Sequence, residues 1–146
     1  MEKIILGPGM GELDDGSDPA MSIGVATECA SGVAVSLSGL INPAGSTTEQ
    51  AEGIFDIIEE IIVDDLSGSL DDITHLRLYV RDDVFTTELR NDLHQLRRDR
   101  FDYPDFPAAT MVGVSQLVHE DSTIEIEVEA LIPEEEWDKT IIEPED

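Results

Sequence analysis

The sequence is short of several residues and segments that particular functions require. Only one of its 146 residues is a cysteine, Cys29, which excludes an internal disulfide and a zinc site built from cysteines. It contains no apolar run of roughly 18 residues or more, and its first residues lack the basic and apolar regions of a signal peptide. We therefore expect a cytoplasmic protein that does not enter a membrane.

Common catalytic motifs are missing as well. The sequence has no Gly-x-Ser-x-Gly, phosphate-binding loop, His-Glu-x-x-His or Cys-x-x-Cys. Its three histidines, His75, His94 and His119, are scattered over different predicted elements, and none has a partner at metal-ligand spacing. We interpret them as ordinary surface or hydrogen-bonded residues and expect neither a metal nor a cofactor.

Basic residues are scarce and acidic residues abundant. The chain has 8 Lys and Arg residues and 34 Asp and Glu residues, which gives a formal net charge of −26. A hydrophobic content of 40% in periodic segments argues against disorder, so the pattern indicates a folded core with an acidic surface. Such a surface is typical of a protein from a salt-loving source, because molar salt screens the self-repulsion. It also argues against nucleic acid as a partner, since phosphate is bound by Lys and Arg.

The order of hydrophobic patterns predicts one α+β domain in two layers. Period-2 alternation and helical periodicity give three strands, a helix, a strand, a helix and two strands. Two amphipathic helices then cover one face of a single mixed sheet. The predicted strands are 2–6, 21–27, 33–38, 75–81, 107–117 and 123–131, and the predicted helices are 46–65 and 85–98. We assign 1–132 to the domain and 133–146 to an acidic C-terminal extension.

The predicted strands 75–81 and 123–131 give the sheet a charged face. Ile124, Ile126 and Val128 alternate with three glutamates in the second of them, and an alternation of this kind leaves one face apolar and the other polar. The first strand alternates in the same way and carries basic residues. We predict that Arg77 and Arg81 offset Glu127 and Glu129 across the polar sheet face or a subunit contact, which leaves Glu125 for a cleft. Arg97, Arg98 and Arg100 end a helix, and we interpret them as partners of its dipole in preference to a ligand site.

Four segments together resemble the RidA/YjgF-like family of reactive-intermediate (enamine/imine) deaminases. They are Val33-Ala-Val-Ser-Leu-Ser-Gly39, the run from Ser69 to Asp82, Asn91 within the second helix, and the two strands from Pro107 to Ala130. The Pro-x-x-Thr strand followed by the Glu-x-Glu strand carries most of this resemblance, which covers about residues 24–130. It implies a chorismate-mutase-like fold with a sheet of about six strands. It also implies a homotrimer with three clefts between subunits.

The resemblance assigns the family's site residue by residue. The water-orienting glutamate falls on Glu125, and substrate-binding positions fall on Ser38, Gly39, Asn91 and Thr110. Two family residues are absent here. The position of a tyrosine falls near Val25, and that of the arginine that clamps the substrate carboxylate falls on Ala109. The chain therefore resembles an arginine-less branch of the family.

Without the clamp, deaminase activity does not follow from the resemblance. Arginine holds a carboxylate through paired, charge-assisted hydrogen bonds, which alanine cannot make. We expect a homotrimer that binds a small molecule, such as an imine or a 2-oxo acid analogue, in clefts between subunits, with hydrolysis left open. One alternative is a genuine imine deaminase with a substitute arginine; the other is a non-catalytic binding or structural module. An RNA-cleaving role is the least expected, because the surface repels phosphate.

Overall fold

The computed structural model describes residues 1–11, 13 and 15–144. Its six strands are β1 (Lys3–Pro8), β2 (Ser22–Cys29), β3 (Gly32–Leu40), β4 (Ile73–Arg81), β5 (Ala108–Val114) and β6 (Ile124–Pro133). Its longer helices are α1 (Thr47–Glu59), which continues as a π-helix (Glu60–Asp65), and α2 (Thr87–Arg100). Two short 3-10 helices, Leu70–Asp72 and Asp82–Val84, flank β4.

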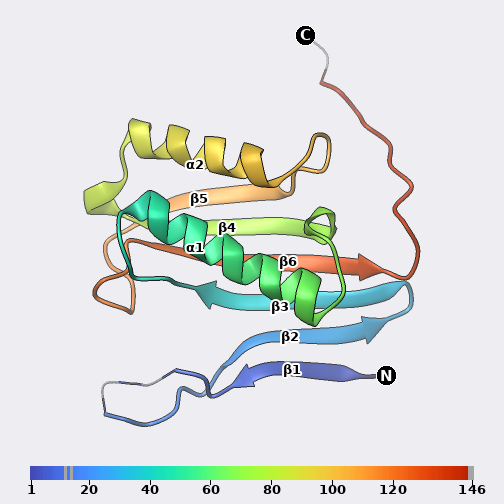
Figure 1. Cartoon of the computed structure of the whole chain (residues 1–146), viewed down its shortest axis with the longest axis horizontal. Coiled ribbons are helices and arrows are strands. Elements are labelled where there is room, and N and C mark those ends of the chain that lie inside the picture. Colours follow the sequence, from blue (N-terminus) through green and yellow to red (C-terminus); the bar gives the residue numbers. More distant parts are fainter. Residues whose placement is uncertain (12, 14, 145–146) are drawn as a thin grey trace.

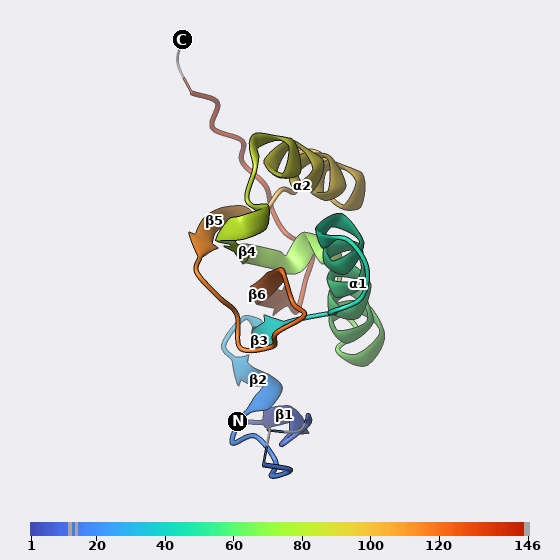
Figure 2. The same ribbon diagram turned by 90° about the vertical axis from the view of Figure 1, so that its left-hand side faces the viewer.

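All six strands form one mixed sheet in the order β1-β2-β3-β6-β4-β5 (Figure 1). Neighbouring strands are antiparallel except for β4 and β5, which are parallel and are joined through α2. Figure 2 shows α1 and α2 on the same side of the sheet. The predicted two-layer α+β fold is therefore confirmed.

The core lies between the helices and the sheet because each element presents one apolar stripe. Ile124, Ile126 and Val128 of β6 are almost completely buried, and the glutamates between them point to the opposite face. Leu89, Leu93 and Leu96 of α2, together with Ile54, Phe55, Ile58 and Ile62 of α1 and its π-helical extension, cover the apolar face of the sheet. Each fully buried Leu or Ile side chain contributes on the order of 1.5–3 kcal/mol, so this stripe pattern fixes which sheet face the helices cover.

A capping box begins α1. The Ser46 Oγ accepts a hydrogen bond from the Glu49 N–H at 3.2 Å, and Glu49 Oε1 accepts one from the Ser46 N–H at 3.1 Å. The neighbouring Thr47 and Gln50, which offer the same motif in sequence, instead contact the segment before β6. The Gln50 side-chain oxygen accepts from the Thr123 N–H at 3.0 Å, and the Thr47 and Thr123 hydroxyls lie 2.7 Å apart.

Most predicted boundaries differ from the observed ones by one to three residues, and two of these differences have a clear cause. The second helix begins at Thr87 and not at Phe85, because Asp82–Val84 forms a 3-10 turn and Thr86 caps the helix through the Leu89 N–H. The predicted strand 107–117 ends at Val114, where β4 ends and the β4–β5 pairing stops with Arg81 opposite Val114. A loop over 115–123 follows, which is longer than the 118–122 segment left between the two predicted strands.

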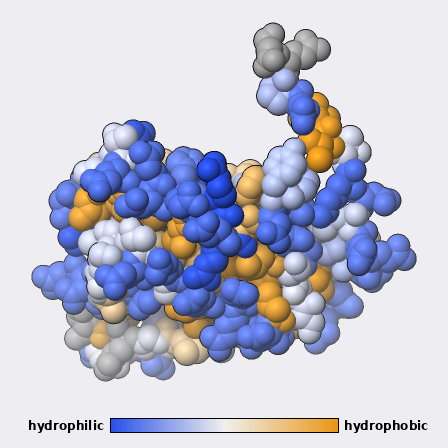
Figure 3. Space-filling view, turned by 45° about the horizontal axis from the view of Figure 1, so that its top comes forward, coloured by the Kyte–Doolittle hydropathy of each residue, from blue (hydrophilic) through white to orange (hydrophobic). Residues whose placement is uncertain are grey.

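The C-terminal extension is partly attached to the domain. The Trp137 indole N–H donates to Asp72 at 3.0 Å, and the Lys139 ammonium lies 2.6 Å from the Asp105 carboxylate. Ile142 is 89% exposed, and Figure 3 shows this segment extending from a body whose visible face is mostly hydrophilic. The division of the chain into a domain and an extension at residue 133 stays a prediction. The last two residues of the extension, 145 and 146, lie outside the described part.

Candidate functional site

The strands β4 and β6 place seven polar side chains on the sheet face that the helices leave uncovered. We call this the polar face; its residues are His75, Arg77, Tyr79, Arg81, Glu125, Glu127 and Glu129. Arg77 lies 3.2 Å from the Glu129 carboxylate, and the Tyr79 hydroxyl donates to Glu127. These contacts are diagonal, because Arg77 is directly opposite Glu127 and Tyr79 is directly opposite Glu125.

Within one chain, the prediction for the two arginines is half right. Arg77 offsets Glu129 as expected, but Arg81 contacts none of the three glutamates of β6. It pairs with Asp83 at 2.6 and 2.9 Å and donates to the Glu120 carbonyl at 3.1 Å. Arg81 is the last residue of β4, so the chain turns immediately after it and brings Asp83 within reach.

Glu125 is the polar-face carboxylate without a partner in the described part of the chain, where it accepts no hydrogen bond and forms no ion pair. Its side chain is half-buried. Burial raises the pKa of Glu125, and the nearby charge of Glu127 raises it further. A carboxyl group with this combination of burial and a like-charged neighbour is a candidate for proton transfer.

Gly39 makes the space that the Glu125 carboxyl occupies. A Cβ at residue 39 would lie 2.5 Å from the Glu125 Cδ and 2.7 Å from Oε1. The closeness follows from the pairing of β3 with β6, where an irregularity between Leu37 and Leu40 shifts the register. The glycine and the glutamate predicted for the site thus lie in direct contact within one chain.

A cavity of about 370 Å³ opens beside this contact, and we call it the glutamate cavity. Strands β3, β4, β5 and β6 contribute to its lining, and the loop after β5 covers one side. The lining residues are Gly39, Tyr79, Val114, Gln116, Leu117, Val118, Glu125 and Glu127. The loop residues Gln116, Leu117 and Val118 were absent from the predicted site, since neither charge nor a motif marks them in the sequence.

The other predicted site residues do not all meet at this cavity. The Ser38 Oγ donates to the Ser22 carbonyl at 2.6 Å, which ties that hydroxyl to the backbone of β2. Thr110 lies on the helix-free side of β5, with its hydroxyl 3.1 Å from the His75 Nε2. Asn91 is exposed on α2, in the helical layer, and in one chain it does not meet Glu125.

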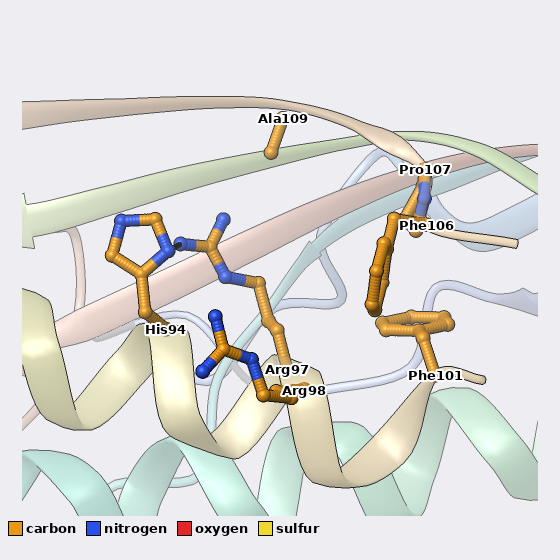
Figure 4. A pocket seen from close by; sticks show the side chains of 7 residues that line it. All are labelled: His94, Arg97, Arg98, Phe101, Phe106, Pro107 and Ala109. Carbon is orange, nitrogen blue, oxygen red and sulfur yellow. Dashed lines mark hydrogen bonds between the residues drawn. The ribbon is translucent and has the colours of Figure 1, made fainter. Parts of the chain in front are cut away.

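Ala109 lies on the other side of the sheet. It is paired with the buried Leu76, so its methyl group points toward the helical layer. There it lines a second cavity of about 260 Å³ between α2 and β5 (Figure 4), which we call the arginine cavity. The residues around it are His94, Arg97, Arg98, Phe101, Phe106, Pro107 and Ala109.

The arginines at the end of α2 therefore have different surroundings. Arg100 lies 2.8 Å from Asp56 and 3.6 Å from Glu59, and it lies over the Phe55 ring. Arg97 and Arg98 face the arginine cavity instead (Figure 4). Burial lowers the pKa of Arg97 from its usual value. The helix dipole alone, which was our sequence-based interpretation, does not account for this placement.

Over residues 1–11, 13 and 15–144, no three or more His, Cys, Asp or Glu side chains are grouped so that they could hold a metal ion. Within the same residues, none of the helices is both long and apolar enough to cross a membrane.

Known structures share this fold. Rv2704 from Mycobacterium tuberculosis, a member of the YjgF/YER057c/UK114 family, is 20% identical, with a TM-score of 0.70 over 90% of this chain and 100% of that one. NMB1025 of Neisseria meningitidis, a YjgF-family protein, is 16% identical, with a TM-score of 0.70 over 92% and 98%. RidA from an Antarctic Psychrobacter is 20% identical, with a TM-score of 0.66 over 88% and 98%. No family model and no curated protein matches the sequence. The chain therefore has the fold of the YjgF/RidA proteins.

Proposed function

We propose that the chain is a member of the RidA/YjgF family that binds a small metabolite through the glutamate cavity. The observation that carries this proposal is Glu125 itself: half-buried, unpaired in the described part of the chain, raised in pKa and fitted against Gly39. The shared fold supports it, and so does the resemblance, which assigns the family's water-orienting glutamate to Glu125 at this cavity.

The ligand most compatible with these residues is a small imine or a 2-oxo acid analogue. In hydrolysis of an imine, water adds to the carbon of the C=N bond, and the nitrogen takes up a proton. The C–N bond then breaks, so that one imine and one water give a carbonyl compound and ammonia. In this proposal Glu125 holds the water and accepts its proton. Its pKa is raised toward neutral pH, which suits a general base.

From the same family resemblance we propose a homotrimer in which the polar face is turned toward neighbouring subunits. The uncovered charged face supports this, as do Val112 on β5 and Val118 on the following loop, which are 40% and 100% exposed. Light scattering in molar salt tests the assembly. A mass of one chain at all concentrations would contradict it.

Two rival functions remain. In the first, the protein is a true deaminase with a substitute for the arginine missing at Ala109. Arg77 and Arg81 already contact Glu129 and Asp83, so Arg97 is the candidate for that role. In the second, the protein is a binding or structural module without chemistry.

The exposed free thiol of Cys29 fits a reducing compartment, and we propose a cytoplasmic location.

The test is hydrolysis of 2-iminopropanoate in molar salt by the wild type and by Glu125→Gln. We expect weak turnover that falls about a hundredfold in the variant, since a positioned general base contributes roughly 10²–10⁴-fold. Turnover that is equal in both proteins would show that Glu125 is not the base. No turnover in either would favour the module, and the binding of 2-oxobutanoate, measured by calorimetry, then decides whether the cavity takes a ligand.

A further inference from the structure

The glutamate cavity is lined by two carboxylates and by no basic residue. Of the described residues around it, Glu125 and Glu127 are acidic, and none is Lys, Arg or His. The two arginines of the same sheet face, Arg77 and Arg81, are each paired with a carboxylate that lies outside the cavity. Within the part of the chain that the structure describes, the cavity therefore has negative charge and no counter-ion.

The two acids have different surroundings. The Tyr79 hydroxyl donates to Glu127, which ties that carboxylate to β4. Tyr79 is directly opposite Glu125 in the pairing of β4 with β6, so its side chain is the nearest cross-strand neighbour of this acid. The Glu125 carboxyl packs against Gly39 and accepts no hydrogen bond in the described residues. One carboxylate is thus held by a hydrogen bond, and the other is open to a ligand.

The remaining wall of the cavity is mostly apolar. Val114 at the end of β5 and Leu117 and Val118 of the next loop belong to it. Figure 2 shows this loop passing along the helix-free side of the sheet toward β3. Opposite charges attract more strongly where water is partly excluded, and the ring of Tyr79 adds its own attraction for a cation. A ligand that fits is small and positively charged with a short apolar body, whereas an anion is repelled by both acids.

We propose that the substrate of the glutamate cavity is the iminium ion of a small aldehyde or ketone, a cation that carries no carboxylate. This inference rests on the proposed function, which it narrows from imines and 2-oxo acids in general to cations. A substrate without a carboxylate needs no arginine clamp, and this agrees with alanine at position 109, where the resemblance places that clamp.

Hydrolysis of such a cation balances without a further reactant. The water oxygen forms a bond to the iminium carbon, and one electron pair of the C=N bond moves onto nitrogen. Glu125 takes one water proton and passes it to the nitrogen. The C–N bond then breaks with its electron pair on nitrogen, and the remaining hydroxyl proton follows the same route. One iminium ion and one water give one carbonyl compound and one ammonium ion, while Glu127 attracts the charge and transfers no proton.

The test is an NMR titration of the full chain in molar salt, followed at the backbone amide signal of Gly39. Molar salt screens the attraction of a cation to the acidic outer surface. The probe is isopropylammonium, compared with isobutyrate, which is an anion of similar shape, and with the neutral isobutyramide. Glu127→Gln removes one charge and keeps an acceptor for the Tyr79 hydroxyl. Glu52→Gln is the matched control, because Glu52 is exposed on α1 in the helical layer.

We expect isopropylammonium to shift the Gly39 signal and to bind at least about tenfold more tightly than isobutyrate or isobutyramide, a ratio that corresponds to roughly 1.4 kcal/mol. Glu127→Gln should weaken this binding about tenfold, and Glu52→Gln should leave it unchanged. Circular dichroism of each variant confirms that it is folded.

The possible failures of this inference and of the proposed function differ. Isobutyrate, isobutyramide or 2-oxobutanoate that binds at Gly39 as tightly as isopropylammonium would overturn the preference for a cation and leave the cavity as a binding site. Unchanged binding of isopropylammonium by Glu127→Gln would do the same. A Gly39 signal that none of these compounds shifts would overturn the proposed function and this inference with it.

Discussion

At the level of single residues, Gly39 and Glu125 interact through packing, because the glycine has no side chain and so leaves room for the glutamate carboxyl. The atoms that a Cβ at residue 39 would displace belong to the end of the glutamate side chain. This end is free to rotate toward the solvent, whereas backbone atoms could not give way so readily. The packing of these two residues therefore determines where the carboxyl lies, and it has only a small effect on the stability of the fold.

We predict that Gly39→Ala changes the free energy of unfolding by no more than about 1 kcal/mol. It should nevertheless lower the pKa of Glu125 toward the ordinary value, because the methyl group pushes the carboxyl out of its half-buried position. A carbon-detected NMR titration of the Glu125 carboxyl measures this. The control is Gly113→Ala, whose Cβ would approach the Asp82 carboxylate instead. An unchanged pKa in Gly39→Ala would contradict the coupling.

The raised pKa of Glu125 also makes a prediction about stability. The folded state binds this proton more tightly than the unfolded chain does, so stability falls as pH rises from the ordinary value near 4.3 through the raised folded value. Glu125→Gln removes this cost. We expect the variant to melt at a higher temperature than the wild type at neutral pH, and the difference to disappear below about pH 4, where both states of the wild type are protonated. The opposite order of melting temperatures at neutral pH would refute this assignment.

At the level of elements, the beginning of α1 rests on one identifiable motif. Removal of the Ser46 hydroxyl leaves the Glu49 N–H without its acceptor, and the reciprocal contact of the Glu49 carboxylate loses its geometry. We predict that Ser46→Ala lowers the free energy of unfolding by about 1 kcal/mol. Thr48→Ala, two residues along and inside the first turn, is the control and should have a smaller effect. Equal losses in urea denaturation would mean that the capping box is not the source of the stability.

Periodicity in the sequence was sufficient to predict the elements and the layers. The alternation of Ile124, Ile126 and Val128 predicts a strand with one buried face, and the structure has that strand with that face. The ends of the strands depended on contacts with neighbouring strands, which the hydrophobic pattern of one strand does not reveal. The strand β5 stops where its partner β4 stops, and the residues that follow Val114 in the sequence do not indicate that end.

The site was predictable only where one strand or one motif defines it. Glu125 and Gly39 were placed by family resemblance, but their contact depends on the register between β3 and β6. The arginine cavity depends on how α2 lies over β5. In the sequence alone, Arg97 is indistinguishable from the other arginines at the end of this helix. The available signal was the Arg97–Arg98 pair with His94 one turn earlier, and only the structure shows that these side chains line one cavity.

At the level of the whole molecule, the acidic surface brings carboxylates close together. Asp71 is an example: partial burial raises its pKa first, and the charge of Asp105 raises it further, while Lys139 partly offsets the effect. We predict that the fold loses stability as salt is lowered from molar to about 0.1 M, where the screening length grows from roughly 3 to 10 Å and more carboxylate pairs repel. Melting temperatures in a series of NaCl concentrations measure this, and equal values at both ends would contradict it.

The sheet ends in two strands, β1 and β5, that each have a partner on one side only. Their outer edges present backbone donors and acceptors that another strand can use, and such edges promote aggregation. The negative charge of the chain opposes that association at neutral pH. Near the isoelectric point of about 4.1 the repulsion vanishes while the edges remain, so acidification should make this protein self-associate into sheets before it unfolds. Purification and crystallisation of the protein are therefore best kept well above that pH.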